Sequence, residues 1–249
     1  KRDIEMFKEL FKNPDFCPDL LKIYPLALVR QSPLYKWYQE GKFKPYSKKQ
    51  LIELLIEIKK LVPRWVRIQR IIRDIPSEEI VEGGVKISNL REVVQKEMAK
   101  RGLKCQCIRC REVRENYNPK EKLYLFREDY LASGGKEIFL TFEDKKREKL
   151  YALLRLRIPN QLKEVQPLLI LPVLKNSAII REVHTYGQMI PVGKKSSSAQ
   201  HRGLGKKLIK EAERITKEEF GLKKIAVISG VGVRDYYRKL GYRLKDTYM

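Results

Sequence analysis

The chain has 249 residues, of which 43% are hydrophobic and 34% are charged, a balance that excludes an intrinsically disordered protein. No apolar run approaches the ~18–20 residues that a membrane-spanning helix needs, and no signal-peptide pattern opens the sequence. The 54 Lys and Arg against 31 Asp and Glu give a net charge of +23, which favours a polyanionic partner such as nucleic acid over a generically basic surface. Because the sequence begins "KRDIEMF" without Met, we expect a fragment of a longer protein.

The first 111 residues alternate between helical and extended patterns. Apolar periodicity and dense apolar runs predict helices over residues 3–13, 46–62 and 89–102 and strands over residues 20–30 and 64–75. Ser47 is the expected N-cap of the second helix, and Gly102 is expected to close the third. This order predicts a parallel α/β unit that forms part of a barrel.

Residues 112–249 follow a different pattern, so we place a domain boundary between residues 111 and 112 and expect a mixed α+β domain after it. The turn between its first two strands carries a Gly134-Gly135 hairpin signal. A polar loop over residues 193–200 follows the fourth strand. The predicted strands span residues 122–131, 136–144, 149–158, 178–192, 223–229 and 242–248, and the predicted helices span residues 203–220 and 233–241.

The segment "QHRGLGKKL" (residues 200–208) lies where the polar loop passes into a helix. Gly203 and Gly205 let the backbone approach a ligand there without obstruction by side chains. The free N–H groups of the first helical turn and the helix dipole suit a phosphate-rich group, and Lys206 adds positive charge. A Gly-x-Gly pair at a helix start also occurs in simple tight turns, so the surrounding sequence must decide.

In this position Gln-x-x-Gly-x-Gly resembles the pyrophosphate loop of the GNAT acetyltransferase superfamily, and "RDYYRKLGY" resembles a later helix of that superfamily. The resemblance implies acetyl-CoA as the ligand, held by the loop and by the main chain of a splayed strand before it. The residues implied are Glu182, Val183, His184, Thr185, Gln200, Gly203, Leu204, Gly205, Lys206 and Tyr237.

Acetyl transfer needs a polarised carbonyl group and a proton for the departing thiolate. Backbone donors in a β-bulge can supply the first, and a tyrosine hydroxyl the second. We choose Tyr237 as the acid and place Tyr236 second, with packing beneath the sheet as the alternative for either. Glu182 and His184 point to one face of their strand, either as general base and positioning group or as a hydrogen-bonded pair without a catalytic role.

Three of the four cysteines form a C-x-C-x-x-C motif in "KCQCIRCRE", at Cys105, Cys107 and Cys110. This spacing brings three thiolates together and suits tetrahedral zinc, with Cys17 as the candidate fourth ligand. Free cysteines and an iron–sulfur cluster are the alternatives. So few and so clustered cysteines argue against a secreted disulfide framework and favour a reducing, cytoplasmic setting.

Segments across the whole chain resemble the catalytic-subunit family of Elongator, among them "DFCPDLLKIYPLALVR", "RWVRIQRIIRDIP", "REDYLASGGKEIFLTFED" and "REVHTYGQMIPV". That family joins a radical SAM barrel to a GNAT-like domain and builds a carboxymethyl group from acetyl-CoA on the wobble uridine (U34) of tRNA. The resemblance implies that residues 1–111 are the C-terminal portion of the radical SAM domain with a zinc-binding segment. Residues 112–249 are then the acetyl-CoA-binding domain. If the chain is archaeal, the resemblance implies that other Elongator subunits are not required.

The chain departs from the family at one point. The C-x-n-C-x-x-C motif that holds the [4Fe–4S] cluster is absent from these 249 residues. We therefore expect S-adenosylmethionine and [4Fe–4S] to serve the full-length protein without being ligated by this chain. The expected function is that of a truncated tRNA-modifying acyltransferase. A protein lysine N-acetyltransferase and a non-catalytic RNA-binding scaffold are the alternatives.

Basic residues of the first domain are the expected contacts to the phosphates of the tRNA anticodon stem-loop. Each of them alone is explained as well by a solvated surface charge, so the expectation concerns the set. The set comprises Arg64, Arg67, Arg70, Arg73, Lys86, Arg101, Lys104 and Arg109.

Overall fold

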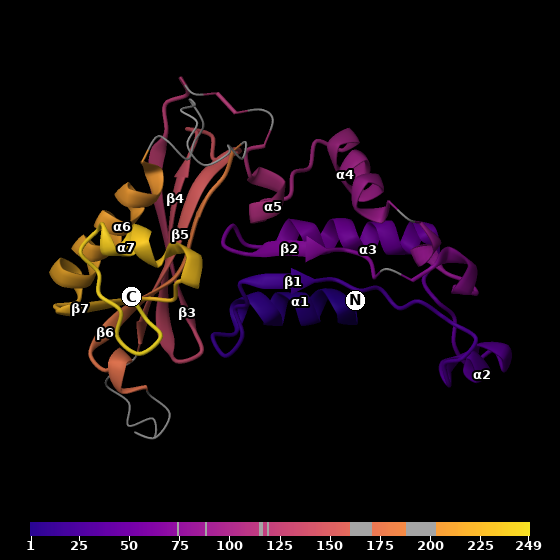
Figure 1. Ribbon diagram of the computed structural model, residues 1–249. Coiled ribbons are helices and arrows are strands. Elements are labelled where there is room, and N and C mark those ends of the chain that lie inside the picture. Colours follow the sequence, from indigo (N-terminus) through magenta and orange to yellow (C-terminus); the bar gives the residue numbers. More distant parts are fainter. Residues whose placement is uncertain (74, 88, 115–116, 119, 160–170, 188–202) are drawn as a thin grey trace. The chain divides into compact units, whose positions relative to one another are not determined.

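Figure 1 shows a computed structural model of the chain, which describes residues 1–73, 75–87, 89–114, 117–118, 120–159, 171–187 and 203–249. The chain divides into two compact units, each with its own hydrophobic core. The first unit comprises residues 1–13 and 18–110, and the second comprises residues 14–17 and 111–249.

The first unit confirms the three helices predicted from apolar spacing. α1 (Arg2–Lys12) and α4 (Leu90–Lys100) both pack on the central helix α3 (Lys48–Leu61). The Ser47 hydroxyl accepts a hydrogen bond from the Gln50 N–H, and the Gln50 side chain accepts one from the Ser47 N–H. This capping box fixes the start of α3 at the predicted residue.

Shorter helical elements complete the unit. Gly102 follows α4 with a φ of +67°, the left-handed conformation expected of a C-cap glycine. The sequence did not predict the others, which are α2 (Leu34–Gln39), α5 (Ile108–Arg111) and the 3-10 turns η1 (Ser77–Glu79) and η2 (Gly84–Lys86).

The two strands of the first unit are parallel, as predicted, but much shorter than the expected runs of residues 20–30 and 64–75. β1 (Leu20–Lys22) pairs with β2 (Arg67–Arg70). Pro25 has no N–H to donate and so works against a longer β1. β2 is also short, because its only partner strand within the described residues is β1, which has three residues.

The second unit is organised around a five-stranded sheet in the order β3-β4-β5-β6-β7. Each of the first four strands runs antiparallel to its neighbour, whereas β7 pairs with β6 in parallel. This pairing confirms the expected mixed α+β arrangement. Their bounds are β3 (Tyr124–Ala132), β4 (Gly135–Glu143), β5 (Leu150–Pro159), β6 (Ser177–Thr185) and β7 (Lys224–Val227).

The predicted hairpin between β3 and β4 is confirmed, although its turn begins one residue before the predicted Gly134-Gly135 pair. Ser133 and Gly134 form its two-residue loop, with φ values of +46° and +71° that suit a type I′ turn. Arg157 donates hydrogen bonds to the carbonyl groups of Ala132 and Ser133, at 3.0 and 2.8 Å. A Cβ atom at Gly135 would lie only 2.8 Å from Arg157 Nη2, so glycine there lets the guanidinium hold the turn.

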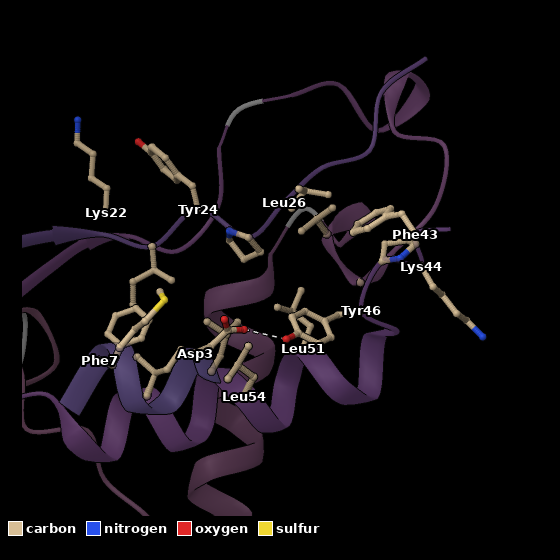
Figure 2. Close-up of a pocket in the computed structure, with 18 residues that line it drawn as sticks. Asp3, Phe7, Lys22, Tyr24, Leu26, Phe43, Lys44, Tyr46, Leu51 and Leu54 are labelled. Atoms are coloured by element: carbon tan, nitrogen blue, oxygen red, sulfur yellow. Dashed lines mark hydrogen bonds between the residues drawn. The ribbon is translucent and has the colours of Figure 1, made fainter. Parts of the chain in front are cut away.

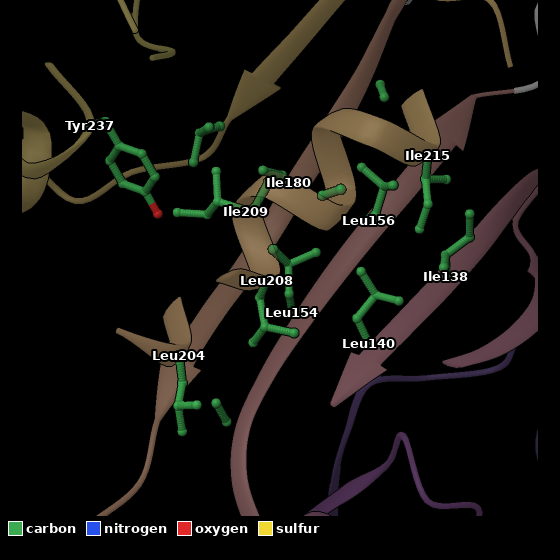
Figure 3. Packing of buried hydrophobic residues seen from close by; sticks show 14 of the residues in the cluster. Ile138, Leu140, Leu154, Leu156, Ile180, Leu204, Leu208, Ile209, Ile215 and Tyr237 are labelled. Carbon is green, nitrogen blue, oxygen red and sulfur yellow. The ribbon is translucent and has the colours of Figure 1, made fainter. Parts of the chain in front are cut away.

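Helix α6 (Leu204–Arg214) packs on the sheet through its apolar stripe. Figure 3 shows Leu204, Leu208 and Ile209 of this helix in one cluster with Leu154 of β5 and Ile180 of β6. Beyond α6 the chain continues as the π-helical turn η6 (Ile215–Glu219), so the helical stretch ends close to the predicted residue 220. The remaining short elements are η4 (Pro172–Leu174), η7 (Val231–Val233) and α7 (Arg234–Arg238), the last shorter than predicted.

The predicted final strand over residues 242–248 is wrong. Asp246 adopts a φ of +52°, which is incompatible with an extended run, and only an isolated bridge joins Lys245 to Tyr248. Met249 instead exchanges two backbone hydrogen bonds with Val227 of β7, at 2.7 and 3.2 Å.

Two further expectations concern the segment after β6. The predicted strand over residues 178–192 is confirmed as far as Thr185, whereas residues 188–192 and the predicted loop over residues 193–200 lie outside the described residues. Among the described helices, none has both the length and the apolar character that crossing a membrane requires.

Candidate acetyl-CoA site and metal centre

β6 and β7 separate midway along β6. Their parallel register ends at Ile180 opposite Val227, and one further hydrogen bond joins the Ile228 N–H to the Ile180 carbonyl at 3.0 Å. β6 continues to Thr185 paired with β5. In the described part of the chain, the other backbone edge of residues 182–185 therefore has no strand partner. An unpaired strand edge offers N–H and C=O groups to an extended ligand.

A β-bulge lies at the point where the strands separate. Arg155 is opposite Glu182, yet the next residue of β5, Leu156, is opposite Ile180, so Arg181 is the extra residue in β6. The bulge turns the backbone immediately before residues 182–185. Such a bulge was expected from the need for backbone donors near the acetyl carbonyl.

The Glu182 side chain forms an ion pair with a buried arginine. Its Oε2 atom lies 2.9 Å from Arg155 Nε, and the Arg155 side chain is only 2% exposed. The Arg155 guanidinium also lies over the Phe139 ring, 5.1 Å from its centroid. His184, the other side chain proposed from the sequence, is exposed, and its ring centroid is 4.4 Å from that of Tyr186. The Glu182 carboxylate is therefore engaged by the buried Arg155 guanidinium.

The first turn of α6 faces the open segment of β6. Gly203 is the N-cap residue, with a φ of +66°, and its carbonyl accepts the Lys207 N–H at 3.0 Å. A Cβ atom at Gly205 would lie 3.7 Å from Thr185 Cγ2 and 3.8 Å from Val183 Cγ1. The structure therefore brings Gly205 of the predicted loop together with the predicted strand residues Val183 and Thr185.

The other predicted residues of this loop differ in their surroundings. Leu204 is buried in the core of the unit, where it holds the first turn of α6 against the sheet. Lys206 is exposed, as a residue that contacts a phosphate group must be. Gln200 lies outside the described residues.

The two adjacent tyrosines of α7 have different environments. The Tyr236 hydroxyl oxygen lies 3.3 Å from the place of a Cβ atom at Gly205, and the residue is 42% exposed. Tyr237 is 6% exposed and belongs to the hydrophobic core, where Figure 3 shows its ring among the side chains from the sheet and α6. Burial raises the pKa of both hydroxyl groups, so both stay protonated at neutral pH.

Two family models cover most of the chain. The Radical_SAM C-terminal domain matches residues 18–100, and the Acetyltransferase (GNAT) family matches residues 103–242. This chain belongs to the GNAT acetyltransferase family. The two matches confirm the predicted fold class, a radical SAM C-terminal part followed by a GNAT unit.

The expected resemblance to the Elongator catalytic-subunit family is also confirmed. A Methanocaldococcus infernus protein named tRNA uridine(34) acetyltransferase is 50% identical over 99% of this chain and 46% of its own length. Elongator complex protein 3 of Saccharomyces cerevisiae is 44% identical over 100% of this chain and 45% of its own length. A solved structure of archaeal Methanocaldococcus infernus Elp3 with an N-terminal deletion (1–46) is 49% identical, with a TM-score of 0.85 over 99% of this chain and 58% of that one. This GNAT family member thus spans about half the length of its curated relatives.

The three clustered cysteines meet in the first unit (residues 1–13 and 18–110), called the radical SAM C-terminal unit from here on, whereas the second unit is called the GNAT unit. The sulfur atoms of Cys105, Cys107 and Cys110 all lie within 4.8 Å of one another. The pKa of Cys110 is lowered, first by hydrogen bonds from the other two thiols and then by the charge of Lys59. Cys17 is buried, falls in the GNAT unit and is not one of this group, so its role as fourth ligand stays a prediction.

The eight predicted tRNA contacts all belong to the radical SAM C-terminal unit, and Arg101 among them is paired with two carboxylates. Arg101 donates two hydrogen bonds to Glu53, at 2.6 and 2.7 Å, and two to Glu97, at 2.8 and 2.9 Å. These carboxylates raise its pKa and neutralise its charge. The exposed members are Arg70, Arg73, Lys86, Arg101 and Lys104, and the half-buried members are Arg64, Arg67 and Arg109.

The same unit contains a cavity of about 600 Å³ that the sequence did not predict. Figure 2 shows Phe7 of α1 and Leu51 and Leu54 of α3 in its apolar lining. The Tyr46 hydroxyl, which also lines the cavity, donates a hydrogen bond to Asp3 at 2.8 Å. The cavity thus brings α1, α3 and the segments after β1 to one place.

Sequence reasoning also missed three buried cations, Lys59, Arg111 and Arg155. Lys59 carries a usable signal, because it lies four residues after Leu55 and eight after Leu51, both of which are buried on α3. That spacing places a lysine on the apolar face of an amphipathic helix. Arg155 interrupts the apolar run "LYALLRLRI" of β5 in the same way.

Proposed function

We propose that this chain is the acetyl-CoA-binding part of an acyltransferase that forms 5-carboxymethyluridine at U34 of tRNA. The observation that carries the proposal is the separation of β6 from β7 beside the start of α6, since it leaves an open strand edge and a helix N-terminus next to each other. Relatives named tRNA uridine(34) acetyltransferase support tRNA as the acceptor. We assign residues 112–249 to acetyl-CoA binding and residues 1–111 to the C-terminal portion of the radical SAM domain with its metal-binding segment.

The residues at the site suit the shape and charge of acetyl-CoA. The edge of residues 182–185 that faces away from β5, which no strand pairs with in the described part of the chain, suits the amide groups of the pantetheine arm. The free N–H groups at the start of α6, from Gly203 to Lys206, together with the helix dipole, suit the pyrophosphate. Gln200 is assigned to the same group from the sequence motif alone.

Tyr236 replaces Tyr237 as our choice for the proton donor. Its hydroxyl group lies at the start of α6, whereas Tyr237 is packed in the core. In the step assigned to this site, a water oxygen bonds to the thioester carbonyl carbon and loses a proton to solvent, the C–S bond breaks to leave the carboxyl group, and the CoA thiolate takes the proton of Tyr236, which solvent then replaces. The bond between the methyl carbon and C5 of U34 is assigned to the part of the longer relatives that this chain does not include. Glu182 contributes its main chain, because its carboxylate is engaged by Arg155. The main-chain N–H groups at the Arg181 bulge are the candidates for polarising the acetyl carbonyl.

The three-cysteine group is proposed to hold zinc in a structural role. Three sulfur atoms within 4.8 Å of one another match the soft ligands and the close spacing of a tetrahedral zinc site. Cys17 is retained as the proposed fourth ligand. When bound, zinc would link its ligands and so stabilise the fold of this segment. S-adenosylmethionine and the [4Fe–4S] cluster are assigned to the part of the longer relatives that this chain does not include.

The basic residues of the radical SAM C-terminal unit are proposed to contact the tRNA anticodon stem-loop, and we place the protein in the cytoplasm. If the protein is archaeal, we propose that it acts without other Elongator subunits. The test is acetyl-CoA turnover by the chain, measured with and without tRNA and over a salt series. Stimulation by tRNA that declines steeply with salt supports the proposal. Transfer to a peptide lysine without tRNA would show a protein acetyltransferase, and failure to bind acetyl-CoA would leave only an RNA-binding scaffold.

A further inference from the structure

Lys59 is a lysine whose whole side chain is buried. It lies on α3 with 0% relative exposure, among leucine and isoleucine side chains of the core. Its Nζ atom donates a hydrogen bond to Cys110 Sγ at 3.7 Å. Among the residues that the structure describes, this sulfur is its only hydrogen-bond partner, and no carboxylate pairs with it.

An ammonium group in such surroundings requires a nearby negative charge. Transfer of an unpaired ion from water to the protein interior is strongly unfavourable even after relaxation. The three-cysteine group can supply this negative charge as thiolates. Its three sulfur atoms lie within 4.8 Å of one another, and one of them belongs to Cys110, which is hydrogen-bonded to Lys59. Gln95 of α4 donates a second N–H to the same sulfur at 3.6 Å, so two helices supply hydrogen bonds to Cys110.

We propose that Lys59 is the built-in counter-ion of the three-cysteine metal site. The inference rests on the proposed zinc site and specifies its charge. A divalent metal with four thiolates, that of Cys17 included, carries two net negative charges, and the ammonium of Lys59 offsets one of them. The hydrogen bond to Cys110 also fixes one ligand in place, as the outer partners of metal ligands commonly do. Lys59 is therefore a positioning residue for the metal.

The test compares four forms of the chain: wild type, Lys59→Met, Lys59→Arg and Lys60→Met. Lys60 is the matched control, because it is the next residue of α3 but is exposed and paired with Glu57. Zinc content and zinc transfer to a competing chelator are measured for each, and thermal unfolding is followed with and without zinc. We expect Lys59→Met to weaken zinc retention by about tenfold or more, Lys59→Arg to restore most of it and Lys60→Met to match wild type.

The unfolding curves separate this role from simple packing. Methionine removes a buried charge, so the metal-free Lys59→Met chain should be no less stable than wild type, while its gain in stability from zinc should shrink. Two results would overturn this inference and leave the zinc proposal intact. One is equal zinc retention by wild type and Lys59→Met, and the other is a loss of stability in Lys59→Met that is the same with and without zinc. A wild-type chain that takes up no zinc would overturn the metal proposal and this inference with it.

Discussion

The hydroxyl oxygen of Tyr236 lies 3.3 Å from the position that a Cβ atom would take at Gly205. A real Cβ atom at that distance would force the tyrosine to move by a few tenths of an ångström. The first turn of α6 and the tyrosine of α7 therefore fit together because residue 205 is glycine. Their contact ties the phosphate-binding end of the site to the proposed proton donor.

Gly205→Ala should lower acetyl-CoA turnover more than acetyl-CoA binding. The added methyl group shifts the Tyr236 hydroxyl, and a small misplacement of a reacting group is enough for roughly a tenfold loss of rate. Steady-state turnover and calorimetric binding measure the two effects. Gly232→Ala is the control, since a Cβ atom at Gly232 meets nothing within 4 Å. Equal losses in the two variants would contradict the prediction.

Tyr236→Phe should reduce acetyl-CoA turnover by about 10²-fold, the scale of a lost general acid, and leave the fold intact. Tyr237→Phe is the natural control, because it removes the same hydroxyl group from the neighbouring, core-packed residue. We expect it to keep most of the activity. The reverse order of the two variants would restore Tyr237 as the acid.

The pH dependence tests the same residue in another way. Turnover that needs protonated Tyr236 is present at low pH and is lost as the pH rises through its pKa. Because burial raises that pKa above the ordinary value of 10.0, the alkaline loss should lie above pH 10 in wild type. Its absence from the residual activity of Tyr236→Phe would complete the assignment, whereas an unchanged profile would refute it.

Glu182→Gln should lower stability and spare turnover. The change removes the negative partner of Arg155, whose side chain is 2% exposed, and should cost about 1 kcal/mol, since Glu182 itself is 38% exposed and partly solvated. Calorimetric unfolding measures that loss. Glu218→Gln, in a pair on the surface of the same unit, is the control. Loss of turnover at unchanged stability would instead make Glu182 a general base.

Lys86→Gln should weaken binding of a tRNA anticodon stem-loop by a few-fold and reduce the salt slope by about 0.7–0.9, the effect of one lost phosphate contact. Lys86 is an exposed member of the basic set. Lys60→Gln removes one positive charge from the same unit outside that set and should leave the slope unchanged. Fluorescence anisotropy at several salt concentrations checks both. Identical slopes for the two variants would argue against a defined tRNA surface.

The sequence predicted those parts of the fold that depend on local chemistry. Ser47 and Gln50 form the capping box of α3, and Ser133 and Gly134 form the hairpin turn, because the residues that decide these structures lie beside one another. Strand length was less predictable. β1 and β2 are short because a strand extends only where a neighbour pairs with it, and no local pattern reports that neighbour.

Site residues, too, were predictable from the sequence only where neighbouring residues in the chain decide their position. The motif residue Gly205 lies against the predicted strand, and Gly203 is the N-cap of the helix that carries it, as expected from their order in the chain. The choice between Tyr236 and Tyr237 depends instead on which way α7 turns its side chains, and two adjacent identical residues give no clue to that. The contact of Lys59 with Cys110 joins residues 51 positions apart and could only be seen in three dimensions.

The separation of β6 from β7 also bears on solubility. A strand edge with free N–H and C=O groups ordinarily invites pairing with another polypeptide and so promotes aggregation. Here the first turn of α6 lies beside the side chains of Val183 and Thr185, so the helix covers one face of the sheet next to this edge. A polypeptide strand added at the edge would bring side chains to that face, where they would meet the helix. The geometry that leaves an edge for a ligand therefore also works against growth of the sheet.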